Sequence, residues 1–269
     1  MRATFAQKPR LAFMKLTNKT AVIYGAGGAV GTALAKAFAQ AGATVALTGR
    51  HREPLEALAR ELGGGATAAQ VDALDEAAIE KHLATLDRVD VSVNAIGIPQ
   101  TGVQGIPLVQ LSAEAFMNPV TTYVRSHFLT ARAAARRMVG QNGGVIITHT
   151  ANPARVAIPL MGGMTPAWAS LEVMMGTFSV EYAAQGVRAL VLRTTGLPET
   201  GTIDEVYGLH ARAMGITREQ FQQMLESRTH RGRHNTLAEL AAAAVFVASE
   251  AGRGFTGTTL DLTGGMTGD

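Results

Sequence analysis

The residues with the clearest chemical use form a glycine cluster, Gly25, Gly27, Gly28 and Gly31. It lies between a short β-branched run and a segment of helical period. Gly25 can take a tight turn, and Gly27 and Gly28 let the backbone approach a pyrophosphate. Gly31 lets the helix pack closely on the strand, and the helix start near Val30 presents free amides and a positive dipole end to phosphates. The cluster predicts a dinucleotide site, and the alternative is a tight turn without a ligand.

Two arginines follow the next β-branched run, where many nucleotide-binding folds carry an acidic residue. The segment reads Thr48-Gly49-Arg50-His51-Arg52. A carboxylate there would repel a ribose 2′-phosphate, whereas a guanidinium can hold it with charge-assisted hydrogen bonds worth roughly 1.5–3 kcal/mol each. Arg50 and Arg52 therefore favour NADP(H) over NAD(H). The alternative is that both arginines are the solvated start of a helix.

The elements that must position these residues alternate along the chain. Short β-branched runs predict seven strands, at 21–24, 44–48, 68–72, 89–94, 144–150, 187–193 and 258–262. Longer segments of helical period separate them, which is typical of a parallel sheet covered by helices. We therefore predict an α/β fold: one Rossmann-like, doubly wound domain with a seven-stranded parallel sheet. The insertion at 202–233 should lie over the carboxyl ends of the strands, where open α/β sheets bind ligands.

Composition and charge exclude several classes of protein. A hydrophobic fraction of 47% excludes a disordered chain, and the lack of cysteine excludes disulfides, thiolate metal sites and a cysteine nucleophile. The net charge of +3 gives no argument for nucleic acid, and no apolar run reaches the roughly 18–20 residues of a membrane span. We expect a cytoplasmic protein that acts on a small-molecule substrate. We expect it to bind no nucleic acid, membrane or metal ion. Residues 1–13 should form a disordered extension, and 14–269 the domain.

From residue 14 onward the sequence resembles the short-chain dehydrogenase/reductase family. The matching motifs are the glycine loop, Asp72, the turn Asn94-Ala95-Ile96-Gly97, and the chain end from Gly257 to Gly265. The resemblance implies that Asp72 contacts the adenine and that the turn with Asn94, Ala95 and Gly97 backs the cofactor and braces the sheet. Each motif departs from the family pattern: Tyr24, Ala29 and Ala95 replace a Thr, a Gly and an Asn.

The segment after the sixth predicted strand also departs from the family. Arg193, Thr194 and Thr195 replace its usual Pro-Gly. By analogy, these residues together with Gly196 and Thr200 would contact the nicotinamide amide or the pyrophosphate.

The catalytic residues of the family are replaced in this chain. The family uses a Tyr as proton donor, a Lys four residues later, a Ser on the fifth strand and an Asn in the fourth helix. The matching positions hold Met164, Trp168, Ala151 and Tyr123, and no lysine follows Lys81. The usual hydride-transfer machinery is therefore absent. A reductase is still conceivable, because hydride transfer is chiefly the chemistry of the cofactor.

Three other residues are candidates for catalysis. Thr150 can donate a hydrogen bond to a carbonyl oxygen, and Tyr123 or His149 can supply a proton, which is commonly worth about 10²–10⁴-fold in rate. Each has an alternative role without catalysis. Thr150 would be an ordinary strand residue, Tyr123 would fill the space of the family's Asn, and His149 would be a core histidine. Without a nearby Lys, the pKa of a tyrosine should stay near its reference of about 10, so reduction is favoured over alcohol oxidation.

An adaptable apolar substrate pocket is expected from Met161, Met164 and Trp168, covered by Tyr207 and His210 from the insertion. The alternative for Met161, Met164 and Trp168 is core packing, and the alternative for Tyr207 and His210 is a position on the surface. We predict an atypical short-chain oxidoreductase that uses NADPH to reduce a small apolar carbonyl or enone compound. The other hypotheses are a catalytically silent NADP-binding sensor or scaffold and a non-redox cyclase or isomerase. The resemblance implies a homodimer or homotetramer formed through helices at 113–138 and 167–184.

Overall fold

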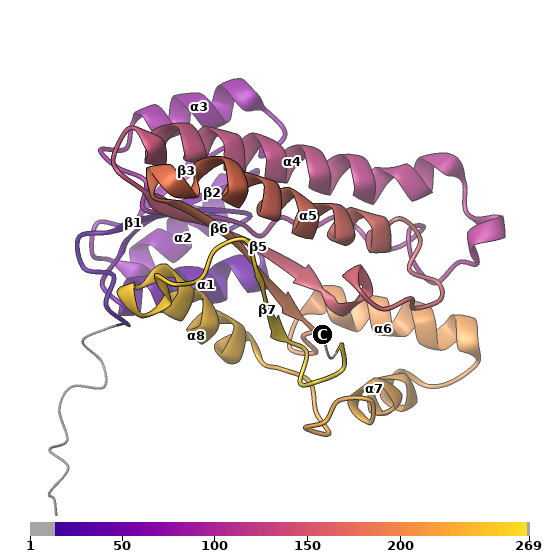
Figure 1. Ribbon diagram of the computed structural model, residues 1–269. Coiled ribbons are helices and arrows are strands. Elements are labelled where there is room, and N and C mark those ends of the chain that lie inside the picture. Colours follow the sequence, from indigo (N-terminus) through magenta and orange to yellow (C-terminus); the bar gives the residue numbers. More distant parts are fainter. Residues whose placement is uncertain (1–13, 268–269) are drawn as a thin grey trace, which may run out of the picture.

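The computed structural model describes residues 14–267 (Figure 1), and the extension predicted at 1–13 lies outside the described residues. Seven strands form one parallel sheet in the order β3-β2-β1-β4-β5-β6-β7. They are β1 (Thr20–Tyr24), β2 (Thr44–Gly49), β3 (Thr67–Gln70), β4 (Val91–Asn94), β5 (Gly144–Ala151), β6 (Val187–Thr194) and β7 (Thr259–Leu262). This confirms the predicted doubly wound α/β fold. The third strand ends before Asp72 and the fourth begins at Val91, so both are shorter than predicted.

Eight α-helices connect or follow the strands in the described residues. They are α1 (Ala29–Gln40), α2 (Arg52–Leu62), α3 (Glu76–Ala84), α4 (Ala113–Val139), α5 (Met164–Tyr182), α6 (Gly201–Met214), α7 (Arg218–Glu226) and α8 (Leu237–Ala248). Short 3₁₀ turns lie at η2 (Leu108–Gln110), η3 (Asn152–Ala154), η4 (Ala183–Gln185) and η5 (Glu250–Gly252).

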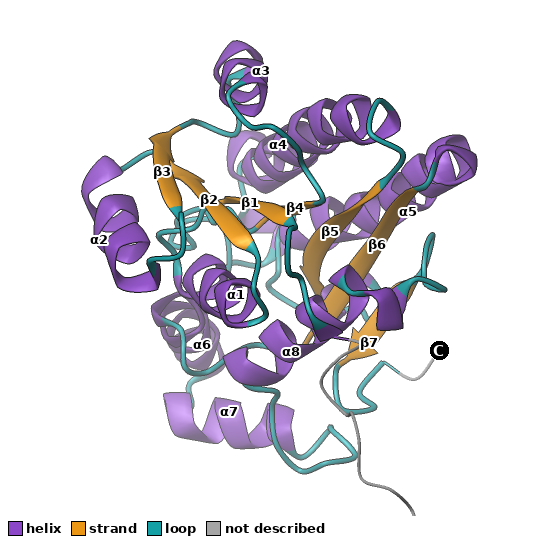
Figure 2. Cartoon of the chain, turned by 90° about the vertical axis from the view of Figure 1, so that its left-hand side faces the viewer, coloured by secondary structure: helices purple, strands orange, loops and turns teal. Residues whose placement is uncertain are grey.

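The sheet is covered on both faces (Figure 2). Helices α3, α4 and α5 lie on one face, and α1, α2 and α8 lie on the other. The strand residues are apolar on both sides, as parallel strands between two helical layers require. In β1, for example, Ala21 and Ile23 belong to the core under α1 and α8, whereas Val22 and Tyr24 belong to the core under α3 and α4.

Two helices of the predicted insertion, α6 and α7, lie beyond the carboxyl ends of β5 and β6 (Figure 1). Both α7 and α8 begin with a capping box, in which a Thr hydroxyl and a Gln or Glu side chain satisfy free backbone amides. These boxes fix the start of α7, which follows α6 in the insertion, and the start of α8, which packs on the sheet. The carboxyl edge of the sheet, roofed by α6, is therefore the place for a site.

Candidate functional site

The glycine cluster forms the turn between β1 and α1, and its members have different tasks. Gly25 has a φ of +76°, and a Cβ there would lie 2.7 Å from the Ala95 carbonyl oxygen. A Cβ on Gly31 would lie 2.3 Å from the Gly25 oxygen, so the protein's own packing requires both glycines. A Cβ on Gly27 or Gly28 would meet no atom closer than 3.4 Å. These two glycines instead leave room for something outside the turn.

The amino end of α1 is open toward this space. Gly28 is the N-cap residue, it provides no side-chain cap, and the first turn of α1 contains no acidic residue. The first amides of a helix have no partner within the helix, and the dipole gives this end a positive character. The turn therefore offers an anion site that no side chain of α1 fills.

A cavity of about 500 Å³, here called the glycine cavity, extends from this turn toward β2 and β3. Its lining includes Gly25, Gly27, Gly28, Arg50, His51, Asp72, Ala95 and Gly97. The Arg50 guanidinium is exposed and forms no ion pair with any residue in 14–267. His51, which also lines the cavity, was not among the predicted site residues.

Arg52 does not line the glycine cavity. Its Nε donates to Glu56 Oε1 at 2.6 Å in the first turn of α2, and the side chain is 70% exposed. The Arg52 guanidinium is therefore paired within α2. Its contact with the cofactor stays a prediction. Asp72 does line the cavity, and its Oδ1 accepts from the Leu74 amide at 2.9 Å.

A second cavity, here called the central cavity, continues from the first across the ends of β4, β5 and β6. It is lined by Gly28, Val30, Asn94, Ala95, Gly97, Tyr123, His127, His149, Thr150, Ala151, Trp168, Thr194, Thr195 and Gly196, among others. The Asn94 amide donates to Thr130 Oγ1 at 3.2 Å, and its Oδ1 accepts from the Ile96 amide at 3.1 Å. Asn94 thus braces β4 against α4 at the base of the cavity.

Two histidines stand in the wall of the central cavity, and burial lowers the pKa of each to about 4. His149 is half-buried, and its Nε2 lies 2.9 Å from Thr194 Oγ1. His127 was missed by the sequence analysis, although its i+4 spacing from Tyr123 on one helix was a usable signal. Its Nδ1 lies 2.9 Å from the Tyr123 carbonyl oxygen and so carries the proton, which leaves a buried Nε2 without a partner in the described residues. Both rings are neutral near pH 7.

The hydroxyl hydrogen of Thr150 is used in a hydrogen bond to the protein, so it is not available to a ligand in the cavity. Its Oγ1 donates to Glu172 Oε1 at 2.9 Å, and the same carboxylate binds the guanidinium of Arg193. Arg193 was expected to touch a cofactor, and this expectation is wrong: the side chain is 2% exposed and pairs with Glu172 and Asp261. Thr150 and Arg193 therefore belong to a buried polar network between α5, β5, β6 and β7.

Tyr123 holds the most central position among the catalytic candidates. It lines the central cavity and also a third cavity under α6, here called the α6 cavity. Burial raises the pKa of Tyr123 to about 12, although the Ile98 backbone N–H, hydrogen-bonded to the phenol, works in the opposite direction. The phenol is thus protonated throughout the physiological range, and its hydrogen remains available to an acceptor.

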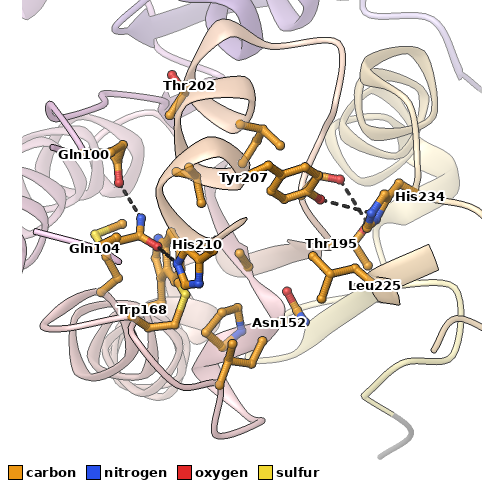
Figure 3. A pocket seen from close by; sticks show the side chains of 18 of the residues that line it. Gln100, Gln104, Asn152, Trp168, Thr195, Thr202, Tyr207, His210, Leu225 and His234 are labelled. Carbon is orange, nitrogen blue, oxygen red and sulfur yellow. Dashed lines mark hydrogen bonds between the residues drawn. The ribbon is translucent and has the colours of Figure 1, made fainter. Parts of the chain in front are cut away.

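The α6 cavity is lined by all five residues predicted for a substrate pocket, which are Met161, Met164, Trp168, Tyr207 and His210. Figure 3 labels Trp168, Tyr207 and His210 among them. Its lining is mainly apolar and contains no Lys, Arg, Asp or Glu among the described residues. Tyr123, Ala151, Trp168, Thr195 and Gly196 line both this cavity and the central one, so the two spaces adjoin. Thr200 lines the central cavity and also caps α6 through its side chain.

Gly196 has its role in the packing of Tyr207. A Cβ on Gly196 would lie 2.3 Å from the Tyr207 phenol oxygen, which is held 3.0 Å from His234 Nε2. We expect Gly196→Ala to displace the phenol and to lower the free energy of unfolding by about 1–3 kcal/mol, as overpacking does. Urea unfolding followed by circular dichroism measures this loss. Gly176→Ala is the matched control, since a Cβ there meets nothing within 4 Å. Equal stability of the two variants would contradict the packing role.

Other kinds of site find no support in residues 14–267. No described helix is long and apolar enough to cross a membrane. Within the same residues, no group of three or more His, Cys, Asp or Glu side chains is placed to hold a metal ion.

The chain is similar over most of its length to known oxidoreductases. A family model described as Enoyl-(Acyl carrier protein) reductase matches residues 25–267. The L-rhamnose 1-dehydrogenase (NAD(P)(+)) of Azotobacter vinelandii is 31% identical, with 94% of this chain and 98% of that protein covered. A Xanthobacter autotrophicus protein named inactive 2-(S)-hydroxypropyl-CoM dehydrogenase 2 is 27% identical, with 87% and 99% covered.

Among solved structures, a gluconate 5-dehydrogenase from Burkholderia cenocepacia, in complex with NADP and tartrate, matches with a TM-score of 0.84 and 27% identity. The match covers 96% of this chain and 99% of that one. Sequence, family model and fold agree over the region that forms the three cavities. The chain belongs to the short-chain dehydrogenase/reductase family of oxidoreductases.

Proposed function

We propose that the chain binds NADP(H) and reduces a small, largely apolar carbonyl or enone compound, with Tyr123 as the hydrogen-bond donor to the substrate oxygen. The position of Tyr123 carries this proposal, because its phenol borders both the central cavity and the α6 cavity. A substrate in the α6 cavity and a nicotinamide in the central cavity would meet beside this hydroxyl. Donors that are aligned before the reaction stabilise charge developing on a carbonyl oxygen.

The residues of the glycine cavity fit a phosphorylated dinucleotide. Gly27 and Gly28 leave space at the turn, and the uncapped amino end of α1 suits a pyrophosphate. Arg50, which has no ion-pair partner in the described residues, is suited to a 2′-phosphate. When bound, NADPH would supply the hydride. The chain's own residues would orient the reactants and polarise the substrate.

Arg50→Ala tests the preference for the 2′-phosphate. We expect the variant to bind NADPH about 10–100-fold more weakly, because a charge-assisted hydrogen bond is worth roughly 1.5–3 kcal/mol. Affinity for NADH should stay unchanged. Isothermal titration of both nucleotides measures the difference, and Arg60→Ala is the matched control, because Arg60 is an exposed arginine on α2 that does not line the glycine cavity. If Arg50→Ala binds NADPH as well as the unchanged protein does, the assignment of Arg50 is wrong.

The activity itself is tested by mixing the full chain with NADPH and a panel of cyclic ketones and enones. We expect NADPH absorbance to fall only when protein and carbonyl compound are both present. Nucleotide binding is followed separately, through the fluorescence of Trp168, which is the single tryptophan and lines the central cavity. Absence of binding by NADPH would overturn the whole proposal.

A catalytically silent NADP-binding protein is the second candidate, and one feature favours it. By the family resemblance, the positions of the usual Ser, Tyr, Lys and Asn hold Ala151, Met164, Trp168 and Tyr123, and three of these four lack a group that can transfer a proton in this way. A sensor or scaffold needs the nucleotide cavity without turnover. Tight NADPH binding with no consumption across the panel would support this candidate over the reductase.

We further propose a homo-oligomer formed through α4 and α5. Phe128 on α4 and Val173 and Val180 on α5 are large apolar side chains that remain exposed on this face, and Val180 is 87% exposed. A hollow between the two helices is lined by Phe128 and Val173, among others.

A cytoplasmic location remains an expectation drawn from the lack of cysteine.

A further inference from the structure

A chain of hydrogen bonds runs along the wall of the α6 cavity and ends on His210 (Figure 3). Gln100 Nε2 donates to the Ile98 carbonyl oxygen at 2.6 Å, and Gln104 Nε2 donates to Gln100 Oε1 at 2.5 Å. His210 Nε2 lies 3.2 Å from Gln104 Oε1. Gln100, Gln104 and His210 all line the cavity. We call these three residues the glutamine relay.

The relay fixes the tautomer of His210. The Ile98 carbonyl can only accept, so Gln100 must use its amide nitrogen there and its oxygen toward Gln104. Gln104 must then present its own oxygen to the histidine. His210 Nε2 therefore carries the proton, and Nδ1 carries a lone pair.

The Nδ1 atom of His210 is a buried acceptor without a partner in the described residues. The side chain is 1% exposed, and burial lowers its pKa to about 4, so the ring stays neutral near pH 7. An acceptor removed from water and left unpaired is destabilising, and such a group in a functional protein calls for an explanation. A ligand that donates a hydrogen bond would remove the penalty.

We propose that the α6 cavity selects a neutral ligand that carries a hydroxyl group on an otherwise apolar frame, and that this hydroxyl donates to His210 Nδ1. Gln100 and Gln104 are positioning residues, because they hold the tautomer that leaves Nδ1 free to accept. A carboxylate is disfavoured, since it has no hydrogen to donate and the described lining offers no Lys or Arg as a countercharge. The substrate class is therefore a hydroxylated ketone or enone rather than a sugar acid.

This inference rests on the proposed function only in treating the α6 cavity as the substrate site, and binding tests it without turnover. Three ketones with one common ring serve as probes: 4-hydroxycyclohexanone, 4-methylcyclohexanone and 4-oxocyclohexanecarboxylate. Binding is followed through Trp168 fluorescence, because Trp168 lines the cavity. We expect the hydroxy compound to bind about tenfold more tightly than the methyl compound, as one buried hydrogen bond allows, and the carboxylate to bind most weakly.

Two variants separate the parts of the proposal. His210→Phe should bind the hydroxy and methyl ketones about equally, and its affinity for the methyl ketone shows that the cavity is still formed. Gln104→Leu should also reduce the preference for the hydroxyl group, although His210 is retained. Gln40→Leu, at an exposed position on α1, is the matched control and should keep the preference.

The tautomer is read directly by nitrogen NMR of protein labelled in histidine. His210 should be protonated at Nε2 and unprotonated at Nδ1, and Gln104→Leu should lose this single state. A proton on Nδ1 in the unchanged protein, equal binding of the hydroxy and methyl ketones, or binding of none of the three overturns the inference. Selective binding without NADPH consumption would instead contradict the reductase and leave this inference intact.

Discussion

Arg193→Met is expected to lower the free energy of unfolding by about 3–5 kcal/mol, because it leaves a buried carboxylate without its cation. Arg193 binds Glu172 through two nitrogens, at 2.9 and 2.7 Å, and the two side chains are 2% and 10% exposed. The loss is a large share of the roughly 5–15 kcal/mol that stabilises a typical domain. Urea unfolding followed by circular dichroism measures it.

Two controls identify the buried charge as the cause. The double variant Arg193→Met, Glu172→Met removes both charges and should regain part of the lost stability. Arg52→Met breaks the exposed pair with Glu56 and should leave stability almost unchanged. If Arg193→Met is no less stable than Arg52→Met, the network between α5 and the sheet does not stabilise the fold.

The architecture could be predicted from the sequence because its signals are local. β-Branched runs, helical period and capping boxes each span only a few residues, and the seven strands are found where these patterns placed them. The glycine turn was likewise readable, since Gly31 is constrained by Gly25 and Ala26 of the turn itself. The boundaries of the strands were predicted less accurately: the third strand was expected to end at Asp72, but β3 ends at Gln70.

The parts of the site that escaped prediction depend on residues distant in sequence. Glu172 and Arg193 are 21 residues apart, and Gln104 and His210 are 106 residues apart. No spacing rule connects such pairs, so Arg193 was assigned to a cofactor and the role of Gln104 was not seen. His210 was predicted in the pocket from its place in the insertion, but its tautomer follows only from the completed chain of hydrogen bonds.

Tyr123→Phe is expected to lower kcat for carbonyl reduction by about 10²–10⁴-fold, which is the usual contribution of a placed proton donor. The ring that fills the cavity wall is kept, and only the hydroxyl is lost. Substrate KM and NADPH affinity should therefore change little. NADPH consumption at saturating ketone measures the effect.

The pH dependence of the unchanged enzyme gives a second view of the same hydroxyl. Because burial raises the pKa of Tyr123 to about 12, its proton is retained in the folded protein well above neutral pH. The reduction rate should show no alkaline decline due to this group below about pH 10, and the oxidation of alcohols, which needs the phenolate as a base, should be slow near neutrality. An alkaline decline centred near pH 8 that disappears in Tyr123→Phe would contradict this assignment of the pKa.

Tyr207→Phe is the matched control for Tyr123→Phe, since Tyr207 lines the α6 cavity but not the central one. Its hydroxyl bonds to His234, so its loss should affect substrate KM more than kcat. A donor must reach the atom where charge develops, and of these two tyrosines Tyr123 borders both spaces whereas Tyr207 borders one. If the two variants lower kcat equally, or if Tyr123→Phe keeps the rate of the unchanged protein, the reducing site does not use the Tyr123 hydroxyl.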